Sequence, residues 1–245
     1  MDKKGNIEVH SKIKLDIYKK YLEAYLSIMI NVPNCDNISI VEPFAGKGIS
    51  DNGENGSALI AKNVIESINN DSGKNIHLIL NDAKYYKDLV ENLQPDKKNK
   101  ILCFDKDANE FIIDVLSQND NNKTHRLFFI DPWGYTQLKE KTYQKIFTAK
   151  KLDFLIFIPF YQIYRFLRKE EDSEQLKPIA NFLSDMGINE EDAKKCSNAE
   201  NFLNEIKKAF IKRAGTKFVY YKVIKNEKCN NKYTLLFLTK HILGA

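Results

Sequence analysis

Short apolar runs alternate along most of the chain with segments whose apolar residues recur every three to four positions. The runs are rich in β-branched and aromatic residues, and they predict strands at residues 38–43, 75–82, 100–105, 126–134 and 151–160. The periodic segments predict helices at residues 11–30, 56–68, 83–93, 108–118 and 139–149. Because continuously apolar strands need helices on both faces, the alternation predicts an α/β fold with a doubly wound, mostly parallel sheet.

The final third of the chain departs from this alternation. Residues 161–200 contain short amphipathic pieces and a charged stretch, which predict a helical insertion or lid. Residues 197–215 predict a helix that begins with a capping box of Ser197 and Glu200 and ends at Gly215. Residues 216–240 predict an antiparallel β-hairpin around an Asn-rich turn. We therefore expect one domain over residues 1–245.

The amino-acid composition argues against a membrane protein, a secreted protein and a metal-binding protein. The chain is 43% hydrophobic, but no apolar run approaches the ~20 residues of a membrane span, so we expect no membrane association. The first lysines are not followed by the apolar core of a signal peptide, which predicts a cytoplasmic location. The 4 cysteines are scattered without a CxxC pair, so neither a disulfide framework nor a metal site is expected. The net charge of +5 favours a polyanionic partner but is too small to identify one.

A glycine loop, EPFAGKG at residues 42–48, follows the first predicted strand. A dinucleotide-binding loop carries G-x-G-x-x-G, but here Asp51 stands at the third glycine, where its carboxylate would repel phosphate. A P-loop is also absent, because no GK[ST] follows at the required spacing. The loop therefore suits a cofactor that lacks phosphates and lies close to the backbone.

S-adenosylmethionine is a cofactor of this kind. Glu42, at the end of the strand, is expected to attract its ammonium group directly or through water, and two glycines let the main chain lie against its methionyl and ribose parts. The candidate cofactor-binding residues of the loop are Glu42, Pro43, Phe44, Ala45, Gly46 and Gly48. A tight turn between a strand and a helix is the alternative interpretation of this stretch.

Acidic residues follow the next two predicted strands. Asp82 ends the second strand, where an acid accepts hydrogen bonds from ribose hydroxyls in doubly wound nucleoside-binding folds. After the third strand, Asp105 or Asp107 is expected to hold the adenine amino group. A helix N-cap is the alternative role for Asp107, which directly precedes a helix. Acids at three successive strand ends favour the nucleoside interpretation.

The fourth strand leads into Asp131, Pro132, Trp133 and Gly134. This motif resembles the [DN]PP[YFW] tetrad of amino-methyltransferases, and DPFG variants occur in methyltransferases of tRNA guanine N2. The resemblance implies that an Asp131 oxygen and the Pro132 carbonyl orient an acceptor NH2 group, while Trp133 packs on a base. The alternative is a rigid turn whose tryptophan fills the core.

The chain as a whole resembles the three-Cys-motif partner proteins, a bacterial and phage family. The resemblance rests on the stretches KLDIYKKYLEAYL, VEPFAGKGISDNGENGSALIA and FFIDPWGY. In the family the loop often reads FAGPG followed by GSP, so Lys47 and Ala58 depart from the pattern without removing a glycine. The resemblance implies a Rossmann-like methyltransferase sheet and a cysteine-motif protein as a partner.

These patterns support one leading hypothesis and two alternatives. The leading hypothesis is an S-adenosylmethionine-dependent methyltransferase that acts on an amino group of nucleic acid, DNA or RNA, with Asp131, Pro132 and Trp133 as the acceptor residues. The first alternative is a catalytically weak or inactive partner subunit of a bacterial defence or mobile-element system. A nicotinamide oxidoreductase is disfavoured by Asp51 and by the terminal hairpin, and no cysteine is placed for cytosine C5 methylation.

Overall fold

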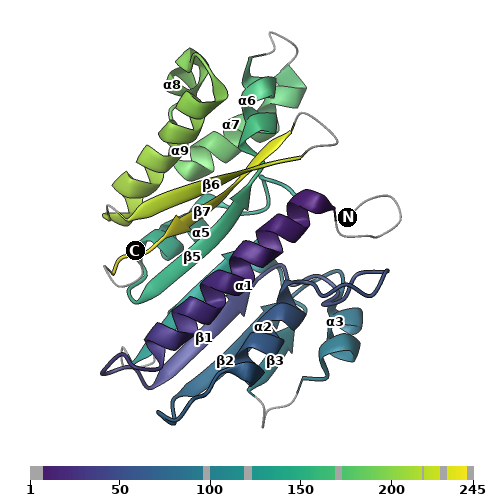
Figure 1. The fold of residues 1–245 in the computed structure, drawn as a ribbon. Coiled ribbons are helices and arrows are strands. Elements are labelled where there is room, and N and C mark those ends of the chain that lie inside the picture. The colour runs from purple at the N-terminus through teal and green to yellow at the C-terminus, as the bar shows by residue number, and fades with distance from the viewer. Residues whose placement is uncertain are drawn as a thin grey trace.

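The protein is built around a seven-stranded sheet with strand order β3-β2-β1-β4-β5-β7-β6 (Figure 1). The structure is a computed structural model that describes residues 8–95, 100–118, 123–168, 173–216, 218–226 and 231–241. The strands are β1 (Asn37–Glu42), β2 (Asn75–Asn81), β3 (Ile101–Phe104), β4 (Thr124–Ile130), β5 (Leu152–Ile158), β6 (Val219–Lys225) and β7 (Lys232–Leu238).

Strands β1 to β5 run parallel, whereas β7 is antiparallel to both β5 and β6. The predicted fold class is therefore confirmed: a doubly wound Rossmann-like sheet, mostly parallel, ends in a C-terminal antiparallel hairpin. The Asn-rich turn predicted between the last two strands falls largely at residues 227–230, outside the described residues.

Helices cover both faces of the sheet. They are α1 (Val9–Met29), α2 (Ser57–Ser67), α3 (Tyr86–Leu93), α4 (Ala108–Ser117), α5 (Glu140–Thr148), α6 (Phe160–Leu167), α7 (Ser173–Met186), α8 (Glu190–Lys195) and α9 (Ala199–Ala214). The core on one face is formed with α1, α2 and α3, and the core on the other face with the helices from α4 onward. Figure 1 shows α1 running diagonally across its face of the sheet, beside α2.

Helix α1 packs on the sheet through its apolar stripe. The Tyr18 ring stacks on Phe129 of β4 with centroids 4.0 Å apart, and Leu22 and Leu26 are fully buried. The helix begins at Val9 and ends at Met29, close to the predicted span of 11–30. This packing carries the first turns of α1 to the carboxyl ends of the parallel strands, where α/β folds bind ligands.

The C-terminal region agrees in part with the sequence patterns. Helix α9 begins one residue later than predicted, because the Asn198 side chain accepts from the Asn201 N–H and Asn198, rather than Ser197, is the N-cap. Gly215 ends the helix with φ of 63°, as predicted. Residues 161–200 hold most of α6, all of α7 and α8 and the start of α9, and their role as a lid stays a prediction. No helix in the described part of the chain has both the length and the apolar composition needed to cross a bilayer.

We expect Leu22→Ala to lower the free energy of unfolding by about 2–5 kcal/mol, because it removes a fully buried side chain between α1 and the sheet. Urea denaturation followed by circular dichroism measures this change. Lys20→Ala, an exposed position on the same helix, is the matched control and should change the free energy by less than about 0.5 kcal/mol. Equal effects of the two substitutions would contradict the proposed packing of α1.

Candidate functional site

Two neighbouring cavities lie at the carboxyl ends of the parallel strands. The first, of about 390 Å³, is lined by the glycine loop after β1, the segment after β4, the first turns of α1, the end of β5 and Tyr233 of β7. The second, of about 440 Å³, lies between the glycine loop and the segments that follow β2, β3 and β4. Phe44 and Trp133 line both cavities. We call them the loop cavity and the acid cavity.

The glycine loop depends on its glycines for its shape. Gly46 and Gly48 have φ of 65° and 80°, in the left-handed region that side chains with a Cβ rarely adopt. A Cβ on Gly48 would also lie 2.7 Å from Cδ1 of Leu93. The loop is closed by the Gly56 N–H, which donates to the Gly48 carbonyl at 2.8 Å. The main chain is thereby exposed along one wall of the loop cavity.

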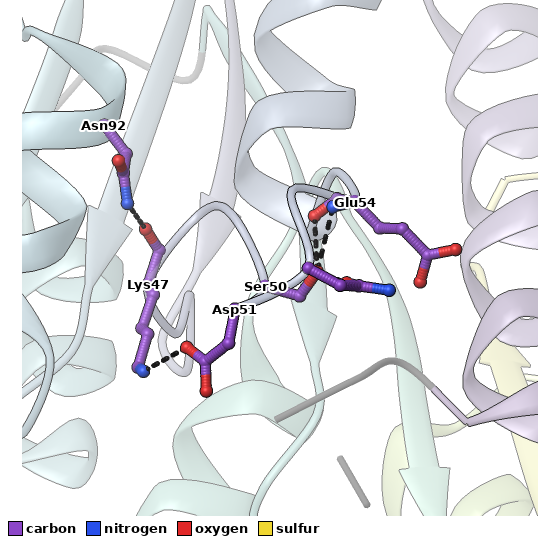
Figure 2. A network of polar contacts seen from close by, with 6 residues as sticks. Lys47, Ser50, Asp51, Glu54 and Asn92 are labelled. Carbon is purple, nitrogen blue, oxygen red and sulfur yellow. Dashed lines mark hydrogen bonds and ion pairs between the residues drawn. The ribbon is translucent and has the colours of Figure 1, made fainter. Parts of the chain in front are cut away.

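Polar contacts within the glycine loop and the segment after it, and one from α3, hold this stretch in place (Figure 2). The Asn92 side chain donates to the Lys47 carbonyl at 2.8 Å, and Ser50 exchanges hydrogen bonds with the backbone of Glu54. The Lys47 ammonium pairs with Asp51 at 2.7 Å. Because Asp51 offsets the lysine charge, the loop offers little attraction to a phosphate group.

Asp82 fastens the loop to the end of β2. Its Oδ2 accepts from the Gly46 N–H at 2.9 Å, and its Oδ1 accepts from the N–H groups of Lys84 and Tyr85 at 3.0 and 2.8 Å. Asp82 lies at the end of the second strand, as the sequence predicts, and it lines the acid cavity. Each carboxylate oxygen has two lone pairs, so Asp82 retains capacity to accept hydrogen bonds from a ligand.

The two acids after β3, Asp105 and Asp107, lie in different surroundings. The Asp107 side chain accepts from the N–H groups of Asn109 and Glu110, so it is the N-cap of α4, and it also lines the acid cavity. Asp105 is exposed and lines neither cavity. Of the two open alternatives, the geometry therefore favours Asp107 as the residue near a ligand.

Glu42 is the last residue of β1 and the first of the glycine loop. Its side chain is fully buried, Tyr18 Oη donates to Oε1 at 2.8 Å, and Ser57 Oγ donates to Oε2 at 2.6 Å. Burial raises the pKa of Glu42 to about 7, although the two hydrogen bonds favour the charged form. Glu42 lines neither cavity, so the structure does not support a direct contact with a ligand, whereas Ser57 lines the loop cavity.

Asp131 directly follows β4, lines the loop cavity with Pro132, and has a cationic partner. Lys14 of α1 forms an ion pair with Oδ2 of Asp131, and the lysine side chain is only 7% exposed. The Lys14 ammonium also lies 4.6 Å from the centroid of the Phe157 ring, which attracts the cation. The predicted acceptor residue thus belongs to a largely buried ion pair within the cavity.

Trp133 lies at the mouth that the two cavities share. It is 61% exposed, so the alternative in which this tryptophan fills the core is wrong. Its backbone N–H donates to the Gln137 side chain at 3.0 Å, and its ring lies 6.0 Å from the Tyr85 ring. The Lys84 ammonium lies within 5.9 Å of both rings. Such exposure leaves a large face of the tryptophan free to contact a ligand.

The patterns along the chain did not single out several residues of the loop cavity. Lys14 falls on the buried stripe of α1 together with Tyr18, and a lysine on an apolar stripe is the signal that would have found it. His10 stacks on Tyr233 with centroids 4.6 Å apart, and both line the cavity. Their approach depends on how α1 crosses to β7, which no local pattern reports. In the described ranges, no group of three or more His, Cys, Asp or Glu side chains is placed to hold a metal ion.

Comparisons with known proteins concern the fold. No protein-family model matches the chain. A search of curated proteins also finds no match. Among solved structures, the chain is similar to protein LPL1258 from Legionella pneumophila str. Philadelphia 1, with 14% identity, a TM-score of 0.51, and coverage of 97% of this chain and 86% of that chain. This likeness supports the Rossmann-like fold, and the narrower resemblance to three-Cys-motif partner proteins stays a prediction.

Two further structures are more distant. An O-methyltransferase from Bacillus cereus in complex with SAH is 11% identical, with a TM-score of 0.42 and coverage of 94% of this chain and 87% of that chain. Fibrillarin from Aeropyrum pernix, with natively bound S-adenosyl-L-methionine, is 12% identical, with a TM-score of 0.40 and coverage of 91% and 76%. At these scores neither carries an argument about this chain.

We expect Glu42→Gln to change the pH dependence of stability. Folding raises the pKa of Glu42 from an ordinary 4.5 to about 7, so the folded protein keeps a proton that the unfolded chain releases. The stability contributed by this group is full below pH 4.5 and is lost as the pH rises to about 7, at about 1.4 kcal/mol per pH unit. Urea unfolding from about pH 5 to about pH 8 should therefore show native stability falling by about 3 kcal/mol relative to Glu42→Gln. If the free energy of unfolding depended on pH in the same way in the native chain and in Glu42→Gln, the raised pKa of Glu42 would be contradicted.

Proposed function

We propose that the chain is an S-adenosylmethionine-dependent methyltransferase that modifies an amino group, with nucleic acid as the acceptor class. One observation carries the proposal: segments that are far apart in the sequence line two cavities that share Phe44 and Trp133. The glycine loop and Asp131 line the loop cavity, and Asp82 lines the acid cavity. This is the edge at which a doubly wound sheet binds its ligands.

The residues present suit this cofactor. When bound, it supplies a methyl group on a positively charged sulfur. The left-handed glycines expose backbone to the loop cavity, so the methionyl part has a surface without side chains to lie against. Asp82 and Asp107 provide the acid cavity with carboxylate acceptors that suit ribose hydroxyls and an adenine amino group, beside Lys84 and Lys106, which line the same cavity. Asp51 offsets the Lys47 charge, which matches a ligand without phosphates.

On the acceptor side, the chain's own groups act by positioning. Asp131 Oδ1 and the Pro132 carbonyl are hydrogen-bond acceptors that can hold an amino group in the loop cavity. Holding that group fixes the direction of the nitrogen lone pair, and positioning of this kind contributes a large part of the rate in group transfer. Lys14 pairs with Oδ2 of Asp131, which leaves Oδ1 as the oxygen that can accept from the acceptor group.

Nucleic acid is proposed as the acceptor class for two reasons. Trp133, the only tryptophan of the chain, presents a largely exposed ring at the mouth of the site, and aromatic faces bind bases by stacking. The net charge of +5 favours association with a polyanion.

A catalytically weak partner subunit is the second candidate function. The observation that favours it is the Lys14 ammonium, which already occupies one oxygen of Asp131. On this proposal the chain binds the cofactor and acts with a partner, and the resemblance of its motifs suggests a three-Cys-motif protein. Purification of tagged chain from cells that also express such a protein should then retain it at a fixed ratio.

We expect the native chain to bind S-adenosylmethionine in isothermal titration calorimetry, and Asp82→Ala to weaken binding by about 10- to 100-fold. Asp82 holds the Gly46 N–H and faces the acid cavity, and hydrogen bonds to a charged group contribute about 1.5–3 kcal/mol. Asp16→Ala, at an exposed position on α1, is the matched control and should bind like the native chain. A folded native chain without measurable binding would overturn the methyltransferase proposal.

Asp131→Ala is expected to bind the cofactor but to lower methyl transfer by about 100-fold or more, because misplaced acceptor groups react slowly. Transfer of tritiated methyl onto total tRNA, genomic DNA and cell lysate measures this and shows which acceptor is labelled. Cofactor binding without labelling of any of the three by the native chain would instead favour the partner subunit.

A further inference from the structure

Lys14 and Asp131 place a donor and an acceptor side by side in the loop cavity. The lysine ammonium pairs with Oδ2 of Asp131, and the described residues offer no hydrogen bond to Oδ1. An ammonium group carries three N–H donors, so Lys14 retains donors beyond the one that its partner takes. The cavity therefore presents a free carboxylate oxygen next to a free N–H group.

The walls around this pair are flat and aromatic. Phe157 lies beneath the Lys14 ammonium, and Tyr233 stacks on Phe157 with centroids 5.0 Å apart. His10 stacks on Tyr233 in turn, at an interplanar angle of 9°. Trp133, on the segment that follows β4, also lines the cavity. A cavity with such walls fits a planar ring better than a flexible aliphatic chain.

We propose that Lys14 is a specificity-determining residue of the acceptor subsite, selecting an amino group on an aromatic ring that has a hydrogen-bond acceptor beside it. The N–H of such a ring donates to Asp131 Oδ1, and the neighbouring ring nitrogen accepts from Lys14. This inference rests on the proposed function and deepens it by assigning to Lys14 the recognition of the ring acceptor beside the amino group.

The same ion pair disfavours alkylamines as acceptors. An alkylamine is protonated near neutral pH, and it would bring a second cation to a carboxylate that Lys14 already neutralises. In a largely buried site this repulsion is weakly screened. An aromatic amine without a neighbouring acceptor would avoid the repulsion but would leave the Lys14 donors unmatched, and an unmatched donor on a buried side chain lowers affinity.

Three small probes of similar size test this selection. Native chain saturated with S-adenosylhomocysteine is titrated with 4-aminopyrimidine, aniline and benzylamine, and binding is followed by NMR chemical shifts. We expect 4-aminopyrimidine to bind at least about 10-fold more tightly than either other probe. Lys14→Met should abolish this preference, so that the probes bind about equally. Lys14→Arg, which keeps the charge and the donors, should retain part of the preference.

Lys20→Met is the matched control, because it makes the same substitution at an exposed position of the same helix and should keep the native preference. The ratio between probes is the informative readout, since a loss of folding would weaken all three together. Equal binding of aniline and 4-aminopyrimidine, no saturable binding of any probe, or an unchanged ratio in Lys14→Met would each overturn the role of Lys14. Failure to bind S-adenosylhomocysteine would count against the proposed function itself, so the two failures are distinguishable.

Discussion

The buried carboxyl group of Glu42 joins three elements that the site depends on. Tyr18 brings α1 to it and Ser57 brings the start of α2, while Glu42 itself ends β1. A buried carboxyl group is stable only when its oxygens are hydrogen-bonded, so α1 and α2 are fixed relative to the strand from which the glycine loop departs. The position of Lys14, one helical turn before Tyr18, follows from this constraint.

The fold could be predicted from the sequence because its signals are local. Continuous apolar strands such as β4 and β5 are separated by helices of regular period, and their order along the chain implies a parallel sheet. The ends of elements were less certain, because neighbouring polar residues compete to cap a helix. At the start of α9, Asn198 and not Ser197 makes the cap, although both residue types suit that position.

The site was only partly predictable for a different reason. Residues at strand ends, such as Asp82 and Asp131, could be placed because parallel strands bring their carboxyl ends to one edge. Sequence position did not reveal which polar groups other side chains already bind. Two hydroxyl groups donate to Glu42 and Lys14 pairs with Asp131, and these three contacts come from α1 and from the first residue of α2.

Asp82 and Asp131 are held in place by different kinds of partner. Asp82 accepts from three backbone N–H groups, and that of Gly46 fastens the glycine loop, so its charge is partly matched before a ligand arrives and the loop geometry is set in advance. Asp131 is instead held by one lysine side chain, Lys14, which comes from α1, a helix far away in the sequence. The orientation of the Asp131 side chain therefore depends on the packing of α1. Helix α1, which precedes the sheet in the chain, thus positions the carboxylate at the end of β4 through Lys14, inside the loop cavity.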